Sequence, residues 1–267
     1  MLVTSADTGG LRRRPGGARG LYDRGVGHAP AGVKDQYAGD VNDYLKYALL
    51  RALAGAHPGT LQVCWMLTAS DGRADGGRLA YLDDPEGFAD LDPEVFQALG
   101  AMVRSGRRTV AAVQDAGVLG GASFHARLLG DEPVARERYF AELWGALAED
   151  DLVFFDPDNG LQVASVAHGR RNSCKYLFWE ELEQALAQRR SACVYQHFPR
   201  VQRAAYIDAR LQALLERFPG HAAFAVSSSW VTHLVCARPA RARRLHRAAG
   251  QLVTRCAGRL TITPLGS

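Results

Sequence analysis

Residues 151–161 of the chain read Asp151-Leu152-Val153-Phe154-Phe155-Asp156-Pro157-Asp158-Asn159-Gly160-Leu161. A short apolar run that ends in a cluster of turn-forming residues predicts a strand buried on both faces. Strands of this kind are typical of parallel sheets, whose ligands bind beyond the carboxyl ends of the strands. Asp156 and Asp158 are therefore expected where an open α/β sheet carries its chemistry, although the same residue types also form turns that have no further role.

The rest of the chain alternates between strand and helix patterns. Strands are predicted over residues 61–67, 109–114, 192–197, 222–227, 233–237 and 260–263. Helices are predicted over residues 42–53, 93–104, 132–148, 175–189, 201–217 and 240–256. This order indicates one α/β domain over residues 35–267, with a doubly wound, mostly parallel Rossmann-like sheet and an antiparallel edge.

The composition of the 267 residues is that of an ordinary soluble protein, with 47% hydrophobic and 22% charged residues. No apolar run approaches the roughly 20 residues that span a bilayer, so no membrane partner is expected. The five cysteines are scattered and form no Cys-x-x-Cys pair, which argues against a disulfide framework or a zinc knuckle. Because the start of the chain also lacks an apolar signal-peptide core, we expect a reduced, cytoplasmic location.

Basic charge is concentrated at the two ends of the sequence. Residues 1–34 carry six Lys or Arg and two Asp, and their Gly- and Pro-rich composition predicts a disordered basic N-terminal arm. Residues 217–267 hold eight Arg and no acid. Arg241, Arg244 and Arg247 recur at helical spacing and are expected to share one face. Such an Arg-rich C-terminal face is compatible with RNA or DNA as a partner, and also with a solvated helix surface.

Polar residues are expected to meet at the carboxyl ends of the strands. Asp156 and His197 each end a predicted buried strand, and parallel strands place such ends on one rim of the sheet. A polar stretch opens the helix near residue 42, and its lysine would hold neighbouring carboxylates ionised. The residues predicted to converge on one cleft are Asp40, Asp43, Lys46, Asp156, Asp158, Asn159 and His197.

Two further positions are candidates for nucleotide binding. The stretch from Thr68 to Arg78 follows the first predicted strand and is rich in Gly, so its backbone N–H groups could face an anion. Asp115 follows the predicted strand 109–114, and an acid at the end of a second strand often binds a ribose hydroxyl.

Three motifs, taken together, resemble one family. The helix opens with Tyr37-Ala38-Gly39-Asp40-Val41-Asn42-Asp43-Tyr44-Leu45-Lys46-Tyr47, the central strand ends in Asp156-Pro157-Asp158-Asn159, and a later strand ends in His197-Phe198-Pro199. They are similar to His-Ala-Gly-Asn-x-Ala-Asp-x-x-Lys-His, Asp-Pro-Pro-Tyr and Trp-Tyr-Pro of the bacterial large-subunit ribosomal RNA adenine methyltransferases of the J type. The similarity extends over about residues 37–265 as an order of elements, including the strand and Pro from Ser228 to Pro239. The family's stacking aromatic is replaced by Asn159.

The resemblance implies an S-adenosylmethionine-dependent methyltransferase that acts on a nucleic-acid base. In such enzymes an aromatic ring stacks on the extruded base, and the Asp of the catalytic motif accepts the hydrogens of the amine. The implied catalytic residues are Asp156, Asp158, Asn159, Lys46 and His197, and the implied cofactor-binding residues are Tyr37, Asp40, Asp43, Thr68, Asp71 and Asp115.

Two other functions are compatible with the same residues. A metal-dependent hydrolase or nuclease would use Asp156, Asp158 and Asp40 as oxygen ligands for Mg²⁺ or Mn²⁺, with assistance from Lys46, Lys175 or His197. A non-catalytic relative would keep the fold and bind a polyanion through its basic residues. The sequence gives neither the substrate nor the oligomeric state.

Overall fold

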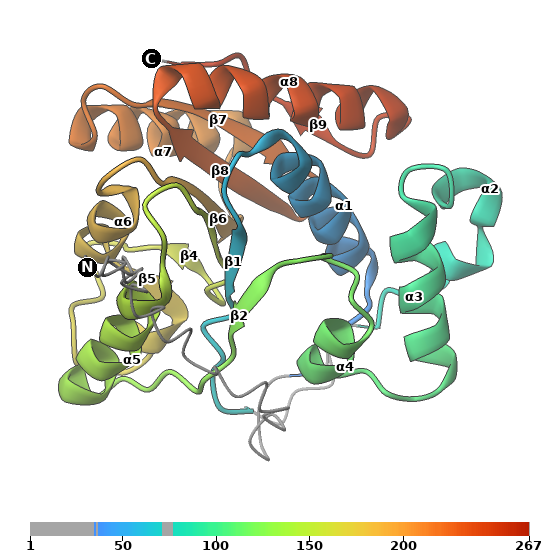
Figure 1. Ribbon diagram of the computed structural model, residues 1–267, viewed down its shortest axis with the longest axis horizontal. Helices are drawn as coiled ribbons and strands as arrows, with labels where there is room; N and C mark the ends of the chain where they lie inside the picture. The colour runs from blue at the N-terminus through green and yellow to red at the C-terminus, as the bar shows by residue number, and fades with distance from the viewer. Residues whose placement is uncertain (1–34, 36, 71–76, 267) are drawn as a thin grey trace, which may run out of the picture.

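The computed structural model describes residues 35, 37–70 and 77–266, and its centre is a seven-stranded sheet in the order β2-β1-β3-β6-β8-β7-β9 (Figure 1). The predicted N-terminal arm and Asp71 lie outside the described residues. The strands are β1 (Leu61–Cys64), β2 (Ser123–His125), β3 (Leu152–Phe155), β6 (Ser191–His197), β7 (Ala222–Ser227), β8 (Val231–Ala237) and β9 (Thr261–Ile262). A separate two-stranded parallel sheet joins β4 (Gly160–Leu161) to β5 (Tyr176–Leu177).

The predicted α/β class with a mostly parallel sheet is confirmed. Strands β2, β1, β3 and β6 are parallel neighbours, so their carboxyl ends lie on one rim. Strand β8 runs antiparallel to both β6 and β7, and β9 runs antiparallel to β7. The antiparallel part is therefore a group of strands on one side of the sheet rather than a single edge strand.

Helices cover both faces of the sheet (Figure 1). One face carries α1 (Val41–Ala56), α3 (Pro93–Arg104), α4 (Val110–Asp115) and α8 (Pro239–Arg255), together with the short η1 (Ala80–Asp83) and α2 (Pro85–Phe88). The other face carries α5 (Pro133–Ala146), α6 (Trp179–Leu186) and α7 (Arg203–Arg217). Successive side chains of a strand point to opposite faces, so Phe154 packs in the first layer and Phe155 in the second.

The prediction of a strand over residues 109–114 was wrong, because this segment forms helix α4. Thr109 caps the helix by accepting a hydrogen bond from the Ala112 N–H at 3.0 Å, and Ala112 and Val113 are buried. The strand beside β1 is instead β2, a short edge strand. Asp115 therefore ends a helix and pairs with Arg107 at 3.4 Å. The ribose contact was predicted for an acid at the end of a strand, and Asp115 does not occupy such a position.

Two other predicted elements are shorter than expected. The strand predicted over residues 61–67 ends at Cys64, since Met66 has a φ of 47° in the left-handed region. The helix predicted over residues 175–189 is limited to α6, because the 3₁₀ turn η2 (Ser173–Lys175) and β5 occupy its first residues. This change places Lys175 at the end of the 3₁₀ turn rather than on α6, and its carbonyl oxygen accepts a hydrogen bond from the Asn159 N–H at 2.9 Å in the loop after β3.

A buried ion pair holds segment 173–181 against α5. Arg136 of α5 donates to Glu181 of α6 through Nε at 2.6 Å and through Nη2 at 2.8 Å. The same guanidinium donates to the carbonyl oxygens of Ser173 at 3.1 Å and Tyr176 at 2.7 Å. Because four acceptors surround one planar cation, segment 173–181 has a fixed position next to the end of β3.

We predict that Arg136→Met lowers the free energy of unfolding by about 3–5 kcal/mol, because it leaves the Glu181 carboxylate buried without its cation. Urea unfolding monitored by circular dichroism measures the change. Arg138→Met, at an exposed position of the same helix, is the control and should change stability by less than about 0.5 kcal/mol. Equal stability of the two variants would contradict a structural role for the buried pair.

Candidate functional site

A cleft of about 1190 Å³ opens at the carboxyl ends of β1, β3 and β6. Its walls come mainly from the residues after these strands and from α1 and α7, and Arg78, Lys175 and Trp230 line it from other segments. Ten of the sequence-predicted site residues line it: Tyr37, Asp40, Asp43, Lys46, Thr68, Asp156, Asp158, Asn159, Lys175 and His197. Asp115 does not line the cleft, and Asp71 lies outside the described residues.

Lys46 lies at the centre of the cleft floor and joins α1 to the end of β3. Its Nζ atom is 2.8 Å from Asp43 Oδ1 and 2.8 Å from Asp156 Oδ2. The rings of Tyr47, Trp65 and Tyr195 surround the ammonium group, with centroids 5.2, 5.6 and 5.4 Å from Nζ. The side chain is 7% exposed, so the aromatic rings replace water around a charge that two carboxylates balance.

The pKa shifts of Lys46 and Asp156 follow from burial and from the imbalance of one positive charge, on Lys46, against two carboxylates, Asp43 and Asp156. Burial alone would lower the pKa of Lys46, but the charges of Asp156 and Asp43 outweigh it and raise that pKa well above its ordinary value. Burial also raises the pKa of Asp156, against the attraction of Lys46. Both directions are consistent, because Lys46 divides its charge between two carboxylates and compensates each only in part.

Asp40 begins α1 and adds another acid to the same floor. Its Oδ1 accepts hydrogen bonds from the backbone N–H groups of Asn42 at 2.8 Å and Asp43 at 3.0 Å, so Asp40 is the cap of this helix. Burial, followed by the nearby charge of Asp43, raises the pKa of Asp40 to about 6. This carboxyl therefore titrates close to neutral pH.

Gly39 sets the approach of the chain to this helix. Its φ is 85°, and a Cβ built there would lie 2.7 Å from Met102 Cε. Its N–H donates to Asp43 Oδ2 at 3.0 Å, and its carbonyl oxygen accepts from the hydroxyl of Tyr81 at 3.0 Å. A residue with a side chain is therefore disfavoured for both backbone and packing reasons.

The loop after β3 is fixed by a residue that the sequence analysis did not identify. Gln196 Nε2 donates to the Asn159 carbonyl oxygen at 2.8 Å, and Gln196 Oε1 accepts from the Leu161 N–H at 2.9 Å. Gly160 has a φ of 113°, and a Cβ there would come within 2.2 Å of the Gln196 amide. The signal in the sequence is a single amide that follows the mostly apolar run 192–195, but the pairing depends on tertiary contacts.

Asp158 and His197 lie beside this loop. Asp158 Oδ2 accepts a hydrogen bond from Thr68 Oγ1 at 3.0 Å, which ties the loop after β3 to the end of β1. The His197 N–H donates to the Asn159 carbonyl oxygen at 3.3 Å. Desolvation lowers the pKa of His197, against the charge of Asp158.

Met66 and Tyr139 also shape the cleft and were not predicted. The left-handed conformation of Met66 directs its N–H to the Tyr139 hydroxyl oxygen at 3.2 Å. A non-glycine residue in this region stores strain, which persists only where the surroundings over-determine it. The backbone of the cleft wall after β1 is thus held by a side chain of α5.

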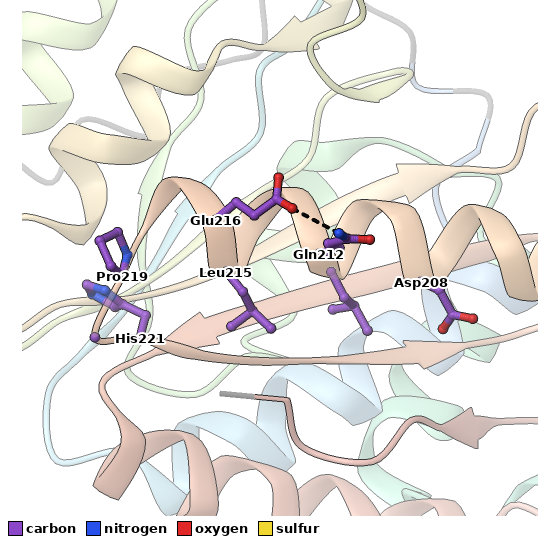
Figure 2. A pocket seen from close by; sticks show the side chains of 8 residues that line it. Asp208, Gln212, Leu215, Glu216, Pro219 and His221 are labelled. Atoms are coloured by element: carbon purple, nitrogen blue, oxygen red, sulfur yellow. Dashed lines mark hydrogen bonds between the residues drawn. The ribbon is translucent and has the colours of Figure 1, made fainter.

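A second hollow, of about 500 Å³, lies on the surface of α7 (Figure 2). Asp208, Gln212, Leu215 and Glu216 border it on the helix, and Pro219 and His221 border it beyond the helix end. Gln212 Nε2 donates to Glu216 Oε1 at 2.9 Å across one turn. None of the sequence-predicted site residues borders this hollow, so the cleft above remains the candidate site.

The predicted Mg²⁺ or Mn²⁺ site at Asp156, Asp158 and Asp40 stays a prediction. Within residues 35, 37–70 and 77–266, no group of three or more His, Cys, Asp or Glu side chains is arranged to hold a metal ion. Asp43 and Asp156 face each other across the Lys46 ammonium group, which already supplies the positive charge between them.

Comparison of the chain with protein-family models gave no match, and comparison with curated proteins gave none either. Across the described part of the chain, no helix has both the length and the apolar character needed to cross a membrane.

We predict that Asp40→Asn stabilises the protein at neutral pH. The raised pKa of Asp40 means that the folded state resists ionisation, so wild-type stability is lost as the pH rises from about 4 through about 6. Asn retains the cap acceptor but carries no charge. The variant should match the wild type near pH 4 and exceed it by up to about 3 kcal/mol at pH 8 in urea unfolding.

Asp84→Asn, at the exposed cap of α2, is the matched control and should not reproduce the gain of about 3 kcal/mol at pH 8. A stability difference for Asp40→Asn that stays constant between pH 4 and pH 8 would show that Asp40 is not strained by its burial.

Proposed function

We propose that this chain is an S-adenosylmethionine-dependent methyltransferase. The observation that carries the proposal is the position of Asp156, a carboxyl at the carboxyl end of β3 that is 15% exposed, lines the cleft and contacts Lys46 at 2.8 Å. The sequence resemblance implies that the substrate amine, which receives the methyl group, lies next to this carboxyl. The α/β sheet supports the proposal, because ligands of such sheets bind at the rim where Asp156 lies.

The residues of the cleft fit the cofactor in size and in polarity. A volume of about 1190 Å³ exceeds the roughly 300–1,000 Å³ of ordinary ligand pockets, which leaves room for a cofactor beside an acceptor. Two buried polar atoms of the lining, Trp65 Nε1 and Asn42 Oδ1, have no hydrogen-bond partner in the described part of the chain. A ligand with both acceptors and donors would satisfy them.

The residues that would hold the cofactor are Tyr37, Asp40, Asp43 and Thr68, whose carboxylates and hydroxyls suit its cationic and hydroxyl groups. When bound, S-adenosylmethionine supplies an electrophilic methyl group. The buried aromatic floor around Lys46 keeps water from this part of the cleft and strengthens each electrostatic contact within it.

Asp156 would receive the proton of the acceptor. Lys46 engages Oδ2, and Oδ1 has no hydrogen-bond donor within the described residues, so Oδ1 is the atom that faces an acceptor N–H or O–H. The raised pKa of Asp156 makes it a stronger proton acceptor than an exposed carboxylate. Lys46 orients this carboxyl without giving up its own proton, because its pKa is raised as well.

Isothermal titration calorimetry with S-adenosylmethionine tests the proposal, and we expect one molecule to bind per chain. Asp156→Asn should retain this binding within about threefold, because the proposed cofactor residues are unchanged. Methyl incorporation into total cellular RNA and DNA should fall at least about 100-fold, because the proton acceptor is removed. Asp115→Asn, an exposed acid outside the cleft, is the control and should leave both measurements unchanged.

Absence of S-adenosylmethionine binding would reject the proposal. Binding of Mg²⁺ or Mn²⁺ in the same experiment, abolished in Asp156→Asn, would support the hydrolase alternative instead.

A further inference from the structure

The outer wall of the cleft differs chemically from its floor. We use this name for Arg78, Lys175, Phe198, Arg200, Arg203, Tyr206, Arg210 and Trp230, all of which line the cleft. The floor carries the buried acids and Lys46, whereas every charged side chain of the outer wall is a cation. None of these five cations forms an ion pair with Asp or Glu among the described residues.

Three of these cations lie over aromatic rings of the same wall. The Arg78 guanidinium carbon is 3.5 Å from the centroid of a Trp230 ring. Arg203 lies over Phe198 at 5.4 Å, and Arg210 lies over Tyr206 at 5.2 Å. The wall therefore alternates flat rings with flat cations, and both surfaces stack on planar heterocycles.

Trp230 is the most accessible of these rings and is held in place. It is 48% exposed, in the turn between β7 and β8. The Ser228 hydroxyl oxygen accepts hydrogen bonds from the N–H groups of Trp230 at 3.2 Å and Val231 at 3.3 Å, which fixes the turn. An exposed indole on a fixed turn loses little conformational freedom when a partner binds.

We propose that the outer wall binds a single-stranded segment of nucleic acid, with Trp230 as a stacking platform for one of its bases. The cations of the wall provide contacts for phosphates, and the rings provide contacts for base faces that a duplex would hide. Since three separate cation–ring pairs line the cleft, the proposed partner is a segment of several nucleotides rather than a single one. This inference rests on the proposed function, since it names the class of acceptor that would reach Asp156.

The outer wall also provides what the loop after β3 lacks. Asn159 has no ring, so the stacking contact that the sequence resemblance implies must come from another residue. Trp230 and Asn159 line the same cleft. Specificity for an unpaired base would then depend on the turn between β7 and β8.

The Arg-rich face of α8 is a poorer candidate for this partner. Its Arg241 forms an ion pair with Asp150, and no arginine of α8 lines the cleft or lies over an aromatic ring in the described structure. Arg243, Arg244 and Arg247 fit a solvated surface.

Fluorescence anisotropy with a labelled RNA of about 12 nucleotides, a length within the usual site sizes of single-strand binders, tests the inference without any cofactor. Single-stranded DNA of the same sequence, the corresponding duplex, and unlabelled AMP as competitor form the other arms. Trp230→Ala should weaken single-strand binding about tenfold, whereas Trp230→Phe should retain most of it. Arg200→Ala/Arg203→Ala should weaken binding and lower the slope of log K against log salt by about 0.7 for each phosphate that the variant no longer neutralises.

Arg243→Ala/Arg244→Ala on α8 removes the same charge from the other basic surface and should leave affinity and salt slope unchanged. A loss of binding in this variant, with full binding in Arg200→Ala/Arg203→Ala, would overturn the inference. So would a duplex that binds as tightly as the single strand, or AMP that competes as well as the oligonucleotide on a molar basis.

The outcome also separates this inference from the proposed function. Each variant is first required to keep the melting temperature of the wild type within about 2 °C. Single-strand binding that depends on Trp230, in a chain that does not bind S-adenosylmethionine, supports the inference and rejects the methyltransferase. Binding of S-adenosylmethionine without any binding of the labelled RNA or DNA rejects the inference and leaves the methyltransferase standing.

Discussion

The burial of Lys46 between Asp43 and Asp156 is the constraint on which the site depends. The ammonium group lies 2.8 Å from each carboxylate and is surrounded by aromatic rings, so Lys46 and Asp43 are largely shielded from water, and Asp156 keeps only a small exposed area toward the cleft. Moving α1 relative to β3 would leave at least one of them uncompensated, at a cost of several kcal/mol. The contact between Lys46 and Asp156 therefore fixes α1 against β3, and the cleft opens where these two elements meet.

The backbone around this buried charge is also unusual. Gly39, Met66 and Gly160 all adopt positive φ values beside the cleft. Tyr81 donates to the Gly39 carbonyl oxygen, Tyr139 accepts from the Met66 N–H, and Gln196 bonds to the residues on either side of Gly160. Glycine adopts this conformation readily, but at Met66, which has a side chain, it costs free energy and persists because packing and hydrogen bonds leave no alternative. The acids of the floor, with raised pKa values at Asp40 and Asp156, add a further cost of burial. Groups with shifted pKa values and strained backbone cluster at functional sites, so these features together favour this rim of the sheet as the functional site.

Much of this arrangement could be predicted from the sequence, for identifiable reasons. The run Leu152–Phe155 and the hairpin strands near residues 222–237 are mostly apolar, which favours buried strands, and parallel pairing then brings Asp156 and His197 to one rim. The prediction for residues 109–114 failed because Val-Ala-Ala-Val suits a strand or a buried helix face, and the Thr109 cap decided for the helix. The roles of Gln196 and Tyr139 could not be predicted, because their partners are backbone groups that come close only in the folded chain.

A double-mutant cycle on Lys46 and Asp156, read out as free energy of unfolding at pH 7, tests the central claim most directly. Lys46→Met should cost about 3–5 kcal/mol, because the buried Asp43 and the largely enclosed Asp156 both lose their cation. Asp156→Asn alone should cost about 1 kcal/mol, since its amide oxygen still accepts from Lys46. The account predicts that Lys46→Met/Asp156→Asn is more stable than Lys46→Met, because one uncompensated carboxylate is gone. If instead the destabilisation of the double variant equals the sum of the two single-variant destabilisations within about 0.5 kcal/mol, Lys46 and Asp156 do not interact, which contradicts the central claim.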